Sequence, residues 1–268
     1  MKIKLPLQNK YFPSDTFEIF SKIQEIDGKF FHFYNFYYLF NMPKCSLIKD
    51  KLKIQINDTI QHYKWNPKFL DTIKNRITSF IEKFKDHGYQ LKAFKATCIW
   101  RLIIGLGASH PQETSMTLHH IYGIPYIPGS AVKGVTRHWV IFSKHDNSEG
   151  KAEKNEEFVK VFGTQKKSGK VIFMDAYPVG DINLKIDIMN PHYPEYYSDF
   201  KPPADWQTPK PIKFLTVEKT KFQFVLLSKD QALLDKACEW LKEALQNFGI
   251  GAKTSLGYGI FQITPDAN

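Results

Sequence analysis

The residues best suited to bind an anion lie near the C-terminus, in the segment GIGAKTSLGYGIF (residues 249–261). Its glycines let backbone amides approach a phosphate group, and Lys253, Thr254 and Ser255 can donate further hydrogen bonds. A Walker A loop would need a glycine directly before its lysine and a helix after it, whereas Ala252 precedes the lysine and the segment follows a predicted helix. We therefore predict a phosphate-contacting loop without nucleotide hydrolysis. A plain helix cap followed by a turn is the alternative.

A second cationic cluster stands at the predicted start of another helix, in the segment IPGSAVKGVTRHW. Ser130 is a suitable N-cap, so the free amides of the first turn would face an anion. Lys133 lies in that first turn, and Arg137 follows four residues later on the same face. Because a cation at a helix N-terminus opposes the helix dipole, Lys133 is better explained by an anionic ligand. The alternative is an ordinary capped helix with an exposed lysine and arginine.

Histidines upstream of both segments are candidates for metal binding or for acid–base catalysis. They are His110, His119 and His120, with Glu113 nearby. Their spacing matches no metal-binding motif, neither HExxH nor a two-histidine facial set. The sequence GLGAS at 105–109 lacks the third glycine of a dinucleotide fingerprint. We therefore expect no metal and no cofactor, with each histidine in a structural role.

The composition is that of a globular, cationic chain. Of its 268 residues 43% are hydrophobic, which is enough for a large buried core. The formal net charge of +10 indicates a polyanionic partner such as nucleic acid, although a merely compositional excess of lysine would give the same value. Three isolated cysteines argue against a disulfide framework and a zinc ribbon. We find no signal-peptide or membrane-span pattern, and expect a reducing, cytoplasmic compartment without membrane contact.

The elements that must position these residues differ along the chain. Residues 1–92 are predicted to be an aromatic-rich and helical N-terminal extension. Apolar residues recur at helical spacing over 52–88. Asn66-Pro67 is expected to divide this stretch into two helices, and His87-Gly88 to end the second.

Residues 93–268 are predicted to form one α+β domain. The expected elements are a strand at 94–107, a helix at 130–142, a solvated loop at 143–157, a strand at 170–178, one or two strands at 211–227, a helix capped by Ser228 with Gln231 and closed by Gly249, and a strand at 258–263. This βαββαβ order is that of a ferredoxin-like (RRM-like) core, with two helices on one sheet face and the other face free. A proline- and aromatic-rich segment at about 178–212 is predicted to be a long insertion between the second and third core strands.

Three longer segments, taken together, carry a family resemblance. They are RLIIGLGASHPQETSMTLHHIYGIPYIPGSAVKGVTRHW, VFGTQKKSGKVIFMDAYP and GIGAKTSLGYGIF, in that order. The combination resembles the RAMP superfamily of CRISPR proteins, and within it the sixth Cmr-type subunit of type III-B effector complexes. The resemblance spans about residues 94–263, with the insertion poorly matched. Ala131 and Val132 differ from it, because Ser and Leu are expected there.

This resemblance implies a non-catalytic subunit on a ferredoxin-like core, which stacks with other Cmr-type RAMP subunits along a guide RNA in antiviral defence. The insertion would be a thumb-like projection that meets the guide–target RNA duplex or the next subunit. The residues expected to contact RNA are Gly129, Ser130, Lys133, Arg137, Gly251, Lys253, Thr254, Ser255 and Tyr258. Contacts from a helix start, loop amides and lysines recognise phosphate and sugar rather than bases, which suits a protein that must hold any guide.

Two other functions stay open on the sequence alone. A metal-independent, guide-processing endoribonuclease of the same superfamily would use His110, His119 or His120 as general base, with Lys133 stabilising the developing charge. A polyanion-binding scaffold would bind RNA through diffuse charge, without regard to particular lysines. Cleavage of RNA without metal would distinguish the first, and indifference to lysine substitutions the second.

Overall fold

The structure is a computed structural model, and the elements below are those that it describes. Its described residues are 44–48, 51–55, 63–108, 110, 114–191, 193, 196, 202, 205–206, 209 and 211–265. The chain divides into two units, Met1–Tyr34 and Asn35–Asn268, and all described residues belong to the second.

The main sheet within the described part of the chain is antiparallel and has the strand order β10-β3-β9-β5, with β6 also pairing with β9. Its strands are β3 (Gln90–Cys98), β5 (Val171–Phe173), β6 (Tyr177–Pro178), β9 (Lys221–Ser228) and β10 (Phe261–Ile263). A second sheet has the order β4-β8-β7, from β4 (Arg101–Leu102), β7 (Leu184–Met189) and β8 (Ile212–Glu218). A separate hairpin pairs β1 (Lys44–Ile48) with β2 (Lys51–Gln55). The described residues therefore form a mixed α/β fold with antiparallel sheets.

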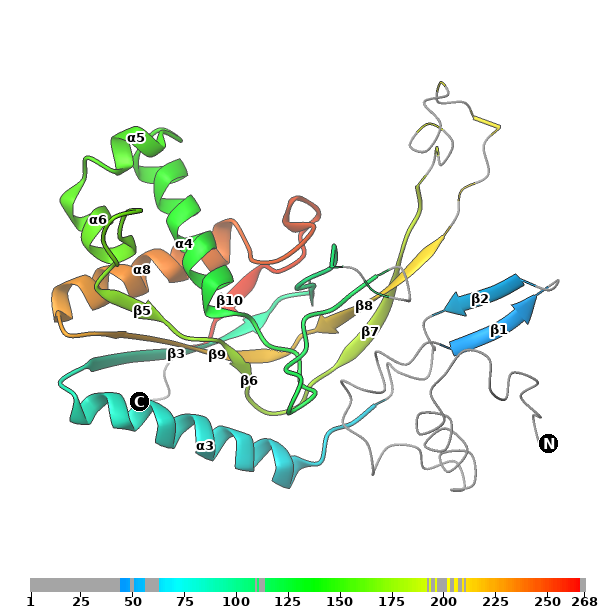
Figure 1. Cartoon of the computed structure of the whole chain (residues 1–268), viewed down its shortest axis with the longest axis horizontal. Helices are drawn as coiled ribbons and strands as arrows, with labels where there is room; N and C mark the ends of the chain where they lie inside the picture. Colours follow the sequence, from blue (N-terminus) through cyan, green and yellow to red (C-terminus); the bar gives the residue numbers. More distant parts are fainter. Residues whose placement is uncertain are drawn as a thin grey trace. The chain divides into compact units, whose positions relative to one another are not determined.

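Two long helices, α4 and α8, cover one face of the main sheet (Figure 1). They span Gly129–Lys144 and Gln231–Asn247, and the short helices α5 (Glu149–Ala152) and α6 (Glu156–Phe162) follow α4. Beneath them lies an aromatic core, in which the ring of Phe224 stacks 5.4 Å from Phe94 and meets Phe261 edge-on at 5.6 Å. The predicted apolar stripe of the last helix is confirmed, because Leu233, Leu234, Ala237, Trp240, Leu241, Ala244 and Leu245 are all buried.

Helix α3 (Pro67–Asp86) covers part of the opposite face of the main sheet (Figure 1). Since side chains alternate along a strand, Val225 and Leu227 point away from the aromatic core, and they pack with Ile81 of α3. The prediction that the second sheet face is free was therefore wrong over the part that α3 covers. None of the described helices is both long and apolar enough to cross a bilayer.

The start and end of α3 follow the sequence signals, whereas the stretch before it does not. Asn66 caps the helix by accepting a hydrogen bond from the amide of Lys68, and Pro67 occupies the first turn. His87 ends it, as predicted. Helix was also predicted from residue 52, but Leu52–Gln55 belong to β2 and pair with β1. A short apolar run is compatible with a helix or with a strand, and here pairing with β1 selects the strand.

Both helix N-caps that were predicted in the core domain were misplaced. Helix α4 begins at Gly129, so its N-cap is Pro128 rather than Ser130. Helix α8 is capped by Asp230, whose carboxylate accepts a hydrogen bond from the amide of Leu233 at 3.2 Å. Ser228 instead ends β9, where its hydroxyl donates to the carbonyl of Lys170.

The Asp230 cap gives a direct stability prediction. Asp230→Ala is expected to lower the free energy of unfolding by about 1 kcal/mol, because the amide of Leu233 loses its acceptor. Chemical denaturation monitored by circular dichroism measures this loss. Glu239→Ala is the matched control on the same helix, since it removes only an exposed ion pair with Lys236, worth about 0–1 kcal/mol. Equal losses in the two variants would contradict the cap assignment.

The regions flanking α6 are more structured than expected. The predicted solvated loop at 143–157 contains the end of α4, all of α5 and the start of α6, and Ala152 is buried. The strand predicted at 170–178 exists but breaks between β5 and β6.

The predicted insertion begins as a β-hairpin, here called the hairpin arm and defined as β7 and β8. The two strands pair from Leu184 opposite Val217 to Met189 opposite Ile212. They extend away from the main sheet (Figure 1), and most residues between them lie outside the described part of the chain. One or two strands were predicted at 211–227, and the structure has two, which belong to different sheets.

Candidate nucleic-acid interface

The glycine loop, defined as residues 249–259, connects α8 to the last strand and is fixed to its surroundings by its own backbone. The amide of Ala252 donates to the carbonyl of Ile103 at 2.9 Å, and the amide of Gly259 donates to that of Arg101 at 2.7 Å. A side chain at position 251 would collide with the carbonyl oxygen of Ile103. Tight packing of backbone on backbone thus accounts for two glycines that a helix cap alone leaves unexplained.

The donors of the glycine loop lie at its outer turn. Lys253 has a left-handed backbone, with φ of 60°, and opens a short 3-10 helix over Thr254–Leu256. Thr254 is partly exposed and Ser255 is exposed, as is Gly251. The ammonium group of Lys253 lies 5.6 Å from the centre of the Phe214 ring on the hairpin arm. It has no acidic partner in the described part of the chain.

Tyr258 differs from the other predicted loop contacts because it is buried. Its side chain is 6% exposed, and its hydroxyl donates to Oδ2 of Asp187 at 2.6 Å. Burial, together with the neighbouring Asp187 carboxylate, raises the pKa of Tyr258 to about 12. The phenol therefore stays neutral near pH 7, and its hydroxyl bonds to Asp187 within the protein.

The start of α4 is already occupied by an internal anion. The amide of Gly129 donates to Oδ1 of Asp175 at 2.6 Å, so one free amide of the first turn is used. Gly129 is buried, and a side chain there would collide with the carbonyl oxygen of Phe173. Ser130 is exposed beside it. Lys133 is partly exposed and, like Lys253, has no acidic partner among the residues that the structure describes.

Arg137, one turn further along α4, makes contacts within the protein. Its Nη2 lies 2.5 Å from the carboxylate of Glu149 and 3.8 Å from that of Glu153. Its guanidinium also lies over the ring of Phe158 at 5.2 Å. A phosphate would have to compete with these carboxylates. Lys133 and Lys253, which have no acidic partner in the described part of the chain, are therefore stronger candidates for direct contact than Arg137.

The candidate histidines do not form a metal cluster within the described residues. His119 stacks on Tyr122 with ring centres 4.3 Å apart, and burial together with the nearby His120 lowers its pKa. Its Nδ1 accepts from the amides of Ile121 and Tyr122, both at 3.3 Å, so the proton of the neutral ring is on Nε2. Burial also lowers the pKa of His110. Glu113 lies outside the described residues.

Two aspartates at this interface were missed by the sequence analysis. Asp175 accepts a hydrogen bond from the amide of Gly129 at the start of α4, and Asp187 accepts one from the hydroxyl of Tyr258. Each is the one acidic residue in a short apolar strand segment, VIFMDAYP and LKIDIM. An isolated carboxylate in such a segment signals an internal partner, but the sequence does not indicate which one.

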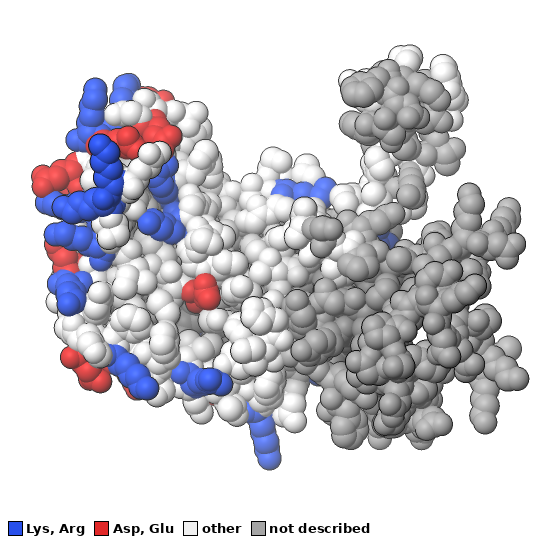
Figure 2. Space-filling model, in the orientation of Figure 1, with Lys and Arg blue, Asp and Glu red and all other residues white. Residues whose placement is uncertain are grey.

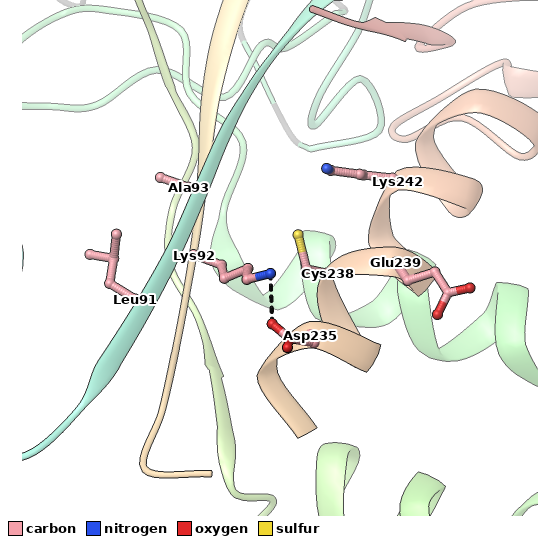
Figure 3. Close-up of a pocket in the computed structure, with 7 residues that line it drawn as sticks. All are labelled: Leu91, Lys92, Ala93, Asp235, Cys238, Glu239 and Lys242. Carbon is pink, nitrogen blue, oxygen red and sulfur yellow. Dashed lines mark ion pairs between the residues drawn. The ribbon is translucent and has the colours of Figure 1, made fainter. Parts of the chain in front are cut away.

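Charge is not gathered into one cationic face in the view of Figure 2. Lysine and arginine side chains alternate there with acidic ones over the end formed by α5, α6 and α8, and the middle of that face is mostly uncharged. A groove of about 470 Å³ between β3 and α8 contains none of the predicted contacts (Figure 3). Within it Lys92 is paired with Asp235 at 2.6 Å.

Comparison with known proteins identifies the class. The family model of the RAMP superfamily matches residues 95–262, and the chain belongs to this superfamily. The predicted resemblance is thus confirmed.

Two relatives of the chain are Cmr6 subunits, that is, sixth subunits of a Cmr system. The chain is 39% identical to the CRISPR system Cmr subunit Cmr6 of Pyrococcus furiosus, over 59% of this chain and 64% of that protein. It is 28% identical to the Cmr6 subunit of Saccharolobus solfataricus, over 72% of this chain and 65% of that protein. The chain thus spans slightly less than two thirds of the length of both relatives. A chain in the cryo-EM structure of the type III-B Cmr-beta complex bound to cognate target RNA is similar, with a TM-score of 0.62 and 25% identity over 75% of this chain and 67% of that one.

Proposed function

We propose that this protein is a non-catalytic RNA-binding subunit of a type III-B CRISPR ribonucleoprotein, which holds the guide RNA backbone and packs against neighbouring RAMP subunits in antiviral defence. Membership of the RAMP superfamily and the similarity to two Cmr6 subunits support it. The similar chain in a complex bound to target RNA supports guide RNA, target RNA and other Cmr-type subunits as partners. We place the complex in the cytoplasm, where guide and target RNA would meet.

The observation that carries the proposal is that two predicted contacts, Lys133 on α4 and Lys253 on the glycine loop, are partly exposed and have no acidic partner among the residues that the structure describes. Because α4 begins at Gly129, Lys133 lies just past the first turn, near a helix start whose amides favour an anion. In the proposed interface Ser130, Lys133, Lys253, Thr254 and Ser255 contact phosphate directly, joined by the exposed backbone of Gly251. Gly129 and Tyr258 shape the backbone around these donors, and Arg137, which is paired with Glu149 and Glu153, makes at most a minor contribution.

We further infer that the main sheet with α4 and α8 is a ferredoxin-like core. The element order β3–α4–β5–β9–α8–β10 and the sheet order β10-β3-β9-β5 support it, because each helix connects two strands and both helices lie on one face. We propose that residues 93–268 form this core with its thumb-like insertion, and that residues 1–92 are an extension of it. The boundary lies slightly earlier than position 93, because β3 begins at Gln90. We propose that the hairpin arm carries the insertion toward the guide–target duplex or the next subunit.

We propose that this subunit does not cut RNA. Support comes from His119, whose ring is stacked and whose Nδ1 accepts two backbone hydrogen bonds, so this atom does not serve as a general base. Its lowered pKa suits a partly buried structural ring. The cleavage assay below tests the endoribonuclease alternative directly.

The test is single-stranded RNA binding over a salt series, with the full chain and a guide-length RNA. Lys133→Ala/Lys253→Ala is expected to reduce the slope of log affinity against log salt by about 1.4, because each lost phosphate contact contributes about 0.7 on single strands. Adding Arg137→Ala should change the slope by less than a further 0.7, since Glu149 and Glu153 already neutralise that side chain. The RNA should remain intact on a denaturing gel without metal.

The control is Lys151→Ala/Lys160→Ala, which removes the same charge from lysines that are paired with Asp146 and Glu156. Its salt slope should stay close to that of the wild type. Equal reductions in both double variants would mean diffuse charge and would favour the polyanion-binding scaffold. A discrete cut in the RNA would replace the proposal by the endoribonuclease.

A further inference from the structure

A partly buried carboxylate joins the hairpin arm to the glycine loop. Asp187 of β7 accepts the hydroxyl of Tyr258 at 2.6 Å and forms an ion pair with Arg101 of β4. Arg101 also contacts the carboxylate of Glu218 on β8 at 3.3 Å. The side chains of Arg101, Asp187 and Glu218 are only 20–22% exposed, so this network is shielded from bulk water and salt more than a surface ion pair.

Apolar contacts join the same two parts. Tyr258 packs with Ile103 and with Phe214 of the hairpin arm, and its ring lies 4.6 Å from that of Trp100. The ammonium group of Lys253 rests over the Phe214 ring. The loop residue that is proposed to contact phosphate is thus supported by one strand of the arm, and the loop's tyrosine is held by the other.

The hydrogen bond between Tyr258 and Asp187 keeps its protonation states near neutral pH. Partial burial opposes ionisation of Asp187, but the hydrogen bonds from Tyr258 and the amide of Ile188, with Arg101, outweigh it and lower the pKa of the carboxyl group. The pKa of Tyr258 is raised to about 12, mainly by burial. The contact is therefore a charge-assisted hydrogen bond between a neutral phenol and a carboxylate, a strong class of hydrogen bond.

We propose that Asp187 is a positioning residue, which couples the hairpin arm to the glycine loop and holds Lys253 in place for the RNA backbone. The inference rests on the proposed function, because it assumes that Lys253 meets RNA. Asp187 itself contacts the loop and not the RNA. A contact of the arm with an RNA duplex or a neighbouring subunit would be transmitted to the loop through this carboxylate.

The test combines a double-mutant cycle with hydrogen exchange on the full chain. Tyr258→Phe removes one hydroxyl and keeps the ring, and is expected to weaken RNA binding severalfold, by no more than Lys253→Ala does, because it acts through the position of that lysine. In a Lys253→Ala background the same change should cost less than about twofold, because the lysine that it positions is gone. Asp187→Asn should speed amide exchange in the glycine loop, whereas Asp181→Asn, at an exposed position before β7, should not.

The outcomes separate this inference from the proposed function. Wild-type affinity in Tyr258→Phe, or equal losses with and without Lys253, would overturn the positioning role while RNA binding stands. Unchanged loop exchange in a folded Asp187→Asn variant would overturn it as well. Wild-type protein that fails to bind RNA, or a Lys253→Ala variant that binds equally well, would overturn the proposed contact and this inference together. Melting curves confirm that each variant is folded at the assay temperature.

Discussion

Phe224→Ala is expected to lower the free energy of unfolding by about 3–5 kcal/mol. The side chain of Phe224 is fully buried on β9, between Phe94 on β3 and Phe261 on β10. Alanine would leave a cavity that backbone-paired strands close poorly, and both ring contacts would be lost. For a domain of this size the melting temperature should fall by roughly 6–20 °C. Chemical denaturation and thermal melting of the full chain measure the two quantities.

The matched control for this prediction is Phe80→Ala. Phe80 lies on α3, is 54% exposed and meets the ring of Phe84 at 5.5 Å, so its loss should stay within about 1 kcal/mol. If Phe224→Ala does not fold at all, Phe224→Leu keeps most of the volume and should fall between wild type and alanine. A Phe224→Leu protein as stable as the wild type, or equal losses for Phe80→Ala and Phe224→Ala, would show that this ring cluster is not the stabilising core.

The sequence predicted the long helices well, because their information is local. Helix α8 has buried side chains at helical spacing, from Leu233 to Leu245, and a glycine directly after its C-cap. Helix α3 has an asparagine cap, a proline in the first turn and a stop at His87. Each of these signals acts within a few residues, so no knowledge of distant partners was needed.

The failures depend on partners far away in the chain. Leu52–Gln55 read as helix but pair with β1. Ser228 and Asp230 are both good caps by type, and the carbonyl of Lys170, 58 residues away, engages the serine. Helix α3 covers a sheet face that the ferredoxin-like order leaves free, because an extension outside that order supplies Ile81. Propensity ranks such alternatives, but tertiary contacts select among them.

In the candidate site, too, the sequence shows which residue types are present but not which partners the fold brings to them. Lys133 and Lys253 could be named as candidates, since a cation near a predicted helix start or in a glycine-rich loop is visible in the sequence, and their contact with RNA stays a prediction. Sequence spacing placed Arg137 on the face of Lys133, but could not show that Glu149 and Glu153 neutralise it. Asp187 was overlooked because its partners, Arg101 and Tyr258, lie 86 and 71 residues away.

Gly259→Ala is expected to lower the free energy of unfolding by about 2–5 kcal/mol and to weaken RNA binding. The backbone of Gly259 has φ of 69°, which costs a side-chain-bearing residue about 1–2 kcal/mol. A methyl group there would also collide with the carbonyl oxygen of Ile250, and overpacking adds about 1–3 kcal/mol. Relief of the clash would pull the glycine loop away from Arg101, whose carbonyl accepts the amide of Gly259.

Gly257→Ala separates the two causes. Gly257 also has a left-handed backbone, with φ of 89°, but open space surrounds the position of its missing side chain. It should therefore lose only about 1–2 kcal/mol, the strain of the backbone alone. The difference between the variants in a denaturation experiment measures the close contact between the two ends of the loop. Equal losses would mean that the loop relaxes freely around Ile250, and a loop that relaxes so easily could not hold Lys253 in a fixed position for the RNA.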